Sequence, residues 1–175
     1  MNRVKDYRSL AVDLVGWLCN YANDNKIESF VVGVSGGIDS AVSSTLAAKT
    51  GKPVYALGMP LNQSKDQETL SDSHLYWLEC NYPNVKRLKA DLSETYAKLM
   101  TDLTKEFTLE YTGNPMAKAN TKSRLRMVTL YHVAANVNGI VVGTGNKVED
   151  YGVGFYTKYG DGGVDIAPLA DLYKT

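Results

Sequence analysis

Residues 30–40 read FVVGVSGGIDS, an apolar run that leads directly into a Ser-Gly-Gly-Ile-Asp-Ser loop. The β-branched and aromatic residues of Phe30–Val32 favour a buried strand, and Gly33 and Val34 carry the chain to its end. A helix is expected to begin at Ile38, directly after the glycines. A strand that passes through a glycine-rich loop into a helix is the repeating unit of an α/β sheet.

The loop itself has the composition of a pyrophosphate-binding site. Gly36 and Gly37 permit backbone angles that a Cβ would exclude, so their N–H groups and those that follow Ile38 can converge on an anion. Ser35 and Ser40 add hydroxyl donors. The alternative is a tight strand-to-helix turn whose glycines serve packing alone.

Asp39 distinguishes this loop from better-known phosphate loops, because its carboxylate stands where a cation bridging phosphates would bind. A Walker loop requires a lysine after the glycines, and none is present. A dinucleotide fingerprint requires G-x-G-x-x-G, and the spacing of Gly33–Gly37 does not meet it. The sequence therefore favours a pyrophosphate-binding loop with its own metal carboxylate.

Composition excludes several classes of protein. The 175 residues contain 19 basic and 19 acidic side chains, so no polyanion such as a nucleic acid is an expected partner. No apolar run approaches the length of about 20 residues needed for a membrane span, and no signal-peptide core is evident, so a cytoplasmic location is expected. Cys19 and Cys80 lack metal-ligand spacing, and two histidines are too few for a histidine-based metal centre.

Helical and strand patterns alternate along the chain. Asn114 and Pro115 form an N-cap followed by proline at the first helical position. This alternation predicts one α/β domain over residues 1–175, with a doubly wound parallel sheet flanked by helices. We expect helices over residues 3–24, 38–49, 64–80, 93–105 and 115–138, and strands over 30–34, 54–59, 85–90 and 140–142. Ligands bind at the carboxyl ends of such strands, where residues 35–40, 60–64, 91 and 143–146 should meet.

Two arginines stand at unusual positions on the last long helix. Arg124 shares a stripe with Val128 and Tyr131, and Arg126 shares one with Leu130. A charge at the head of an apolar stripe needs a partner. The alternative is an arginine whose aliphatic part covers apolar surface.

The segment after the last strand offers a second acid. Thr144 lies just past the strand end, and Glu149 begins a predicted helical turn five residues later. Glu149 could face Asp39 across one site, which would give two carboxylates for one Mg²⁺ ion.

Further polar residues surround Gly160–Gly163, namely Lys158, Asp161 and Asp165. Their density favours a mobile segment that covers a substrate, and a simple surface loop is the alternative. Tyrosines 151, 156, 159 and 173 could stack on bases, although packing is the favoured role.

The loop resembles the SGGxDS motif of the N-type ATP pyrophosphatases. Further segments in order along the chain are KANTKSRLRM (118–127), GTGNKVE (143–149), FYTKYGDGG (155–163) and PLADLYKT (168–175). Together they resemble the NAD synthetases, which are ligases of NAD biosynthesis. That family adenylylates deamido-NAD⁺ with ATP and lets ammonia displace AMP. The resemblance implies an adenine nucleotide α hydrolase-like fold.

The resemblance also implies roles for individual residues. ATP contacts are implied for Gly33, Val34, Ser35, Gly36, Gly37, Ile38, Asp39, Ser40, Thr144 and Lys174. Contacts to deamido-NAD⁺ are implied for Arg124, Lys158 and Asp165, and Mg²⁺ ligands for Asp39 and Glu149. A catalytic role for Asp161 in ammonia capture is our own hypothesis.

Three expectations concern the whole protein. Only 34 residues precede Ser35, too few for an attached glutaminase, so the short ammonia-dependent branch is expected. The resemblance implies a homodimer. The family pattern continues past PLADLYKT with a further strand and helix, so the C-terminus is expected to be truncated.

A non-catalytic ATP-binding module and another N-type pyrophosphatase are the alternative functions.

Overall fold

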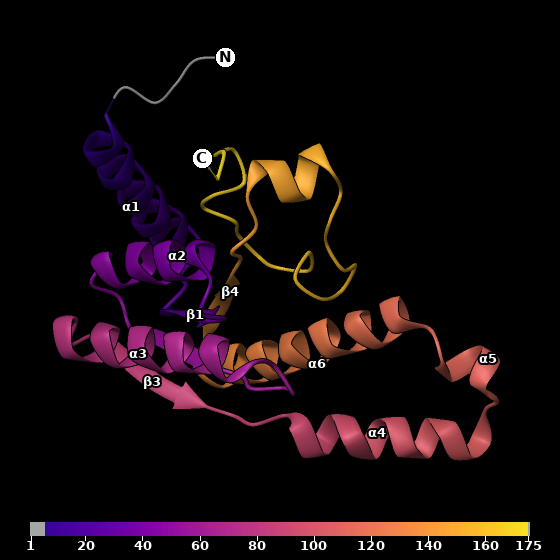
Figure 1. Ribbon diagram of the computed structural model, residues 1–175. Coiled ribbons are helices and arrows are strands. Elements are labelled where there is room, and N and C mark those ends of the chain that lie inside the picture. The colour runs from indigo at the N-terminus through magenta and orange to yellow at the C-terminus, as the bar shows by residue number, and fades with distance from the viewer. Residues whose placement is uncertain (1–5, 175) are drawn as a thin grey trace.

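The computed structural model describes residues 6–174 and shows a parallel sheet with helices on both faces (Figure 1). Its helices are α1 (Tyr7–Asp24), α2 (Ile38–Lys49), α3 (Lys65–Asn81), α4 (Ser93–Glu106), α5 (Leu109–Thr112) and α6 (Pro115–Asn136), and a π-helical turn η1 spans Val148–Gly152. Its strands are β1 (Ser29–Gly33), β2 (Val54–Gly58), β3 (Val85–Lys89) and β4 (Gly139–Val142). The predicted helix start at residues 3–5 and the final residue of PLADLYKT lie outside the described residues.

The strands lie in the order β3-β2-β1-β4, and all neighbours are parallel. Phe30 pairs with Val54 of β2 on one side and with Ile140 of β4 on the other. The chain moves outward from β1 to β3 and then returns to the opposite side of β1. The predicted doubly wound sheet is confirmed, and its switch point lies between β1 and β4.

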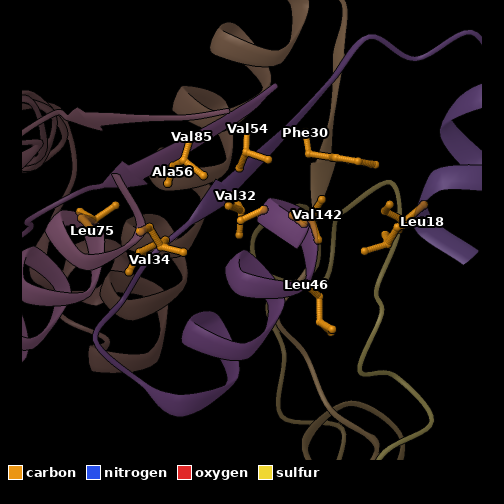
Figure 2. Close-up of a cluster of buried hydrophobic side chains, with 14 of the residues drawn as sticks. Leu18, Phe30, Val32, Val34, Leu46, Val54, Ala56, Leu75, Val85 and Val142 are labelled. Carbon is orange, nitrogen blue, oxygen red and sulfur yellow. The ribbon is translucent and has the colours of Figure 1, made fainter. Parts of the chain in front are cut away.

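Alternate residues of β1 supply two separate cores. Phe30 and Val32 pack with residues of α1, α2 and α3, as Figure 2 shows for Leu18, Leu46 and Leu75. Val31 points to the other face and packs with α6. Both faces of the central strand are therefore covered, which explains its continuous apolar sequence.

Capping residues define where several helices begin. The Ser64 hydroxyl accepts from Gln67 N at 3.4 Å, so Ser64 caps α3 and the helix begins one residue later than predicted. Asn114 accepts from Met116 N at 2.8 Å, which confirms the predicted cap. Helix α6 ends at Asn136 rather than 138, and Asn138 has a φ of +45° that ends the helical path. The short helix α5 was not predicted, because four residues carry no readable period. Across the described residues, no helix has both the length and the apolar character to cross a bilayer.

A buried hydrogen bond joins α3 to the end of β1. Ser71 is 3% exposed, and its hydroxyl donates to Val34 O at 2.7 Å. Ser71→Ala should lower the free energy of unfolding by about 1–2 kcal/mol, because Val34 O then stays buried without its donor. Urea unfolding measures the loss, and Ser9→Ala on the exposed side of α1 is the matched control. Equal stabilities of the two variants would contradict the assigned bond.

Candidate active site

The Ser35–Ser40 loop is held open by its own hydroxyl groups. Ser35 N donates to Ser40 Oγ at 3.1 Å, and Ser40 Oγ donates to Gly37 O at 2.9 Å. Gly37 N donates to Ser35 Oγ at 3.2 Å. No side chain caps the N-terminus of α2, so the N–H groups of its first turn have no side-chain acceptor. This is the arrangement that binds an anion at a helix N-terminus.

A cavity of about 780 Å³ opens beside this loop, at the carboxyl ends of β1, β2 and β4. It lies at the switch point of the sheet, where open α/β sheets bind their ligands. The predicted site residues in its wall are Gly33, Val34, Ser35, Gly36, Gly37, Thr144 and Asp161, together with residues 61–63 of the β2–α3 connection. Asp91 does not line it.

Asp39 and Glu149 meet at one point in space. Lys174 Nζ lies 2.8 Å from Asp39 Oδ2 and 2.8 Å from Glu149 Oε1. The Lys174 ammonium therefore bridges the two predicted Mg²⁺ ligands. Its hydrogen bond lowers the pKa of Glu149, and the two carboxylates raise the pKa of Lys174.

These two carboxylates fit a magnesium ion. They already converge on a single cation, and they are the hard oxygen ligands that Mg²⁺ prefers. No group of three or more His, Cys, Asp or Glu side chains within residues 6–174 forms a metal site. A site with two carboxylates suits Mg²⁺, which retains waters and binds substrate phosphates for the rest of its shell.

Asn146 positions the turn that carries Glu149. Its Oδ1 accepts from Val148 N at 3.0 Å and from Glu149 N at 3.1 Å, and the residue is 1% exposed. Lys147 N donates to Leu172 O at 2.9 Å, which draws the C-terminal segment with Lys174 toward the same site. Asn146 and Lys147 thus position Glu149 and the segment that carries Lys174.

The segment over residues 157–161 is tied to α6 by polar contacts. Asp161 Oδ1 accepts from Ser123 Oγ at 2.6 Å and from Thr157 N at 3.0 Å. Arg124 Nε donates to Lys158 O at 3.1 Å. The segment is therefore anchored along one side of the cavity, although its side chains at 158 and 159 are exposed.

The Asp165 carboxylate binds to β4, the strand at one edge of the sheet. Its Oδ2 accepts from Val141 N of β4 at 2.7 Å, and its Oδ1 lies 3.0 Å from the Tyr131 hydroxyl. The same hydroxyl lies 3.0 Å from Gly163 O. The carboxylate thus has structural partners at both oxygens.

Tyr131 should ionise unusually late. Burial and the nearby Asp165 carboxylate raise the pKa of Tyr131 from 10.0 to about 12. A raised pKa in the folded protein means that its stabilising contribution is complete below pH 10 and is lost as pH rises through about 12. The titration of tyrosinate absorbance should lose one late-titrating phenol in Tyr131→Phe relative to the wild type. An unchanged titration curve would contradict this assignment.

The remaining predicted residues lie outside the cavity wall. Arg124 and Lys158 are exposed, and Lys158 Nζ lies over the ring of Tyr159 at 4.9 Å from its centroid. The stripe that begins at Arg124 faces outward, with Val128 67% exposed, so it is no part of the core. The favoured packing role of tyrosines 151, 156, 159 and 173 is wrong, because all four are largely exposed.

Two charged residues of the cavity wall, Lys122 and Arg126, were not predicted as site residues. Gln63 also lines the wall and falls within residues 60–64, which were expected at this edge of the sheet. The position of Arg126 at the head of an apolar stripe was the available signal, since that arginine is half-buried. Lys122 lies one helical turn before it, on the same side of α6.

Comparisons with known proteins show the family of the chain. Residues 10–175 match the sequence model of NAD synthase. The chain belongs to the NAD synthase family. An NH(3)-dependent NAD(+) synthetase of Carboxydothermus hydrogenoformans is 39% identical over 162 residues, which cover 93% of this chain and 64% of that relative.

Solved structures of this family share the fold. The NMN synthetase from Francisella tularensis is 35% identical with a TM-score of 0.86, and the match covers 98% of this chain and 67% of that one. The NH3-dependent NAD synthetase from Campylobacter jejuni is 26% identical with a TM-score of 0.77, covering 97% and 69%. The chain spans 64% and 66% of the lengths of two curated relatives in the NAD synthase family.

Proposed function

We propose that this protein is an ammonia-dependent NAD⁺ synthetase. It converts deamido-NAD⁺ into NAD⁺ with ATP and ammonia and releases AMP and pyrophosphate. The observation that carries the proposal is the convergence of Asp39 and Glu149 beside a glycine-rich loop with an uncapped helix N-terminus. This chemistry needs such a site, because attack at phosphorus depends on charge neutralisation and alignment.

Each part of the site has a task in the reaction. The N–H groups and hydroxyls of Gly33–Ser40 hold the β- and γ-phosphates. Thr144 contacts the nucleotide from the cavity wall, and Lys174 contacts it from its place beside Asp39. Asp39 and Glu149 would hold Mg²⁺, which neutralises charge on the phosphates when it is bound.

Two bond exchanges complete the reaction. An oxygen of the nicotinate carboxylate bonds to the α-phosphorus as pyrophosphate leaves. Ammonia then attacks the acyl carbon and AMP leaves with the former carboxylate oxygen, while one proton is released from nitrogen. Asp161 lines the cavity and is the proposed residue for ammonia capture.

The acceptor is proposed to contact Arg124 of α6 together with Lys158 and Asp165, which lie in the segment that hydrogen-bonds to α6. These side chains lie away from the cavity wall. A second copy of the chain is therefore proposed to supply the rest of the surface that binds the acceptor. We therefore propose a homodimer that works in the cytoplasm on free ammonia, with residues 1–175 forming one domain.

The direct test is product analysis. The protein is incubated with ATP, Mg²⁺, ammonium and deamido-NAD⁺. NAD⁺, AMP and pyrophosphate should appear in equal amounts, and omission of ammonium should stop NAD⁺ formation. Release of ADP and phosphate, or failure to form NAD⁺, would contradict the proposal.

A second candidate reaction is amidation of the mononucleotide acceptor to NMN. The observation that favours it is the likeness to the Francisella tularensis NMN synthetase, at 35% identity and a TM-score of 0.86. The two reactions differ only in the adenylate half of the acceptor. Comparing kcat/KM for the deamido forms of NAD⁺ and NMN decides between them.

A further inference from the structure

Arg126 is a half-buried cation whose partners are neutral. Its Nε donates to Met59 O at 3.2 Å, and its Nη2 donates to Gln63 Oε1 at 3.2 Å. Both acceptors belong to the β2–α3 connection, so the guanidinium is held in a fixed orientation. Burial lowers the pKa of Arg126, which reflects the cost of keeping this charge away from water.

No carboxylate offsets this charge within residues 6–174, where the ion pairs of the structure do not include Arg126 or Lys122. Both cations line the cavity, one helical turn apart on α6. The remaining charged group in the lining is Asp161, whose Oδ1 already accepts from Ser123 and Thr157. The α6 wall of the cavity therefore carries excess positive charge.

An unpaired, oriented guanidinium in a cavity wall suits a planar pair of oxygens, as in a phosphate group. The Ser35–Ser40 loop already offers one anion site in the same cavity. Cleavage of ATP between its α- and β-phosphates leaves two anions, which require separate groups to hold them.

We propose that Arg126, assisted by Lys122, forms a second anion subsite that binds the phosphate of the adenylate. This assignment rests on the proposed function, in which AMP and pyrophosphate are separate products. It divides the cavity into a pyrophosphate side at the N-terminus of α2 and a monophosphate side on α6.

Calorimetry with AMP and with pyrophosphate as separate probes tests this division. Arg126→Met should weaken AMP binding by about 10- to 100-fold, as expected for loss of charge-assisted hydrogen bonds. Pyrophosphate affinity should stay within about twofold, because the loop donors are unchanged. Arg87→Met is the matched control, since Arg87 is an exposed arginine on β3 that pairs with Glu79.

Each outcome supports or overturns the proposal. Selective loss of AMP binding supports it. Unchanged AMP binding or an equal loss for both probes overturns it.

Arg126 also holds the β2–α3 connection, so Arg126→Lys is measured alongside it. Lysine keeps the positive charge but lacks the paired N–H donors of the guanidinium group. The AMP affinity of Arg126→Lys should therefore lie between those of the wild type and Arg126→Met. If Arg126→Met does not fold, unchanged AMP binding in Arg126→Lys overturns the proposal. Absence of NAD⁺ formation would instead contradict the proposed function and leave these binding results intact.

Discussion

Asp39→Asn and Glu149→Gln should each reduce NAD⁺ formation by about 1000-fold or more. Both changes keep the size of the side chain and remove the negative charge that would hold Mg²⁺. The two carboxylates lie 2.8 Å from the same ammonium, so they act on one cation. The double variant should therefore be little worse than either single variant, because residues that act as a unit are not additive.

Two measurements separate loss of metal from loss of fold. Mn²⁺ binding in the presence of ATP, followed by electron paramagnetic resonance, should weaken in both variants, while their circular dichroism spectra match the wild type. Asp102→Asn is the control, because Asp102 also forms a lysine ion pair, at 2.6 Å to Lys98, on the exposed surface of α4. Near-normal NAD⁺ formation in Asp39→Asn would exclude the paired-carboxylate site.

The sequence predicted most of the fold because strong local signals and the sheet rules agree. The β1 run and the Asn114-Pro115 pair each specify one element, and the alternation of elements leaves few topologies. Helix α5 could not be predicted, because its four residues are too few to show the helical repeat of apolar side chains. Boundaries differ by one or two residues where helix ends are set by backbone angles, as at Asn138.

The residues of the candidate site were harder to predict from the sequence than the fold, because the direction of a side chain depends on tertiary packing. Arg124 and Arg126 both head apolar stripes, yet only Arg126 turns toward the cavity, since α6 buries the face of Met127 and Leu130. The bridge made by Lys174 joins three residues that are far apart along the chain. No spacing rule reaches across such distances, so this contact required the folded arrangement.

Gly36→Ala should damage both the loop and the fold. Gly36 has a φ of +87°, and a Cβ there would stand 2.5 Å from Gln67 O and 3.2 Å from Ser71 N. The positive φ costs about 1–2 kcal/mol for an alanine, and the overlap with α3 backbone adds to it, since that backbone cannot rotate away. We expect a loss of about 2–4 kcal/mol in the free energy of unfolding and of about 100-fold in pyrophosphate affinity.

Gly51→Ala separates the cost of a positive φ from the cost of steric overlap at the added Cβ. Gly51 has a similar φ of +76°, but no atom lies within 4 Å of the Cβ that an alanine would add. This control should lose only about 1–2 kcal/mol and bind pyrophosphate normally, because its strain lies far from the loop. Urea unfolding and calorimetry on the same samples give both quantities. Equal losses in the two variants would mean that the loop moves freely away from α3, and the close approach of Gly36 to Gln67 would then have no role in shaping the anion site.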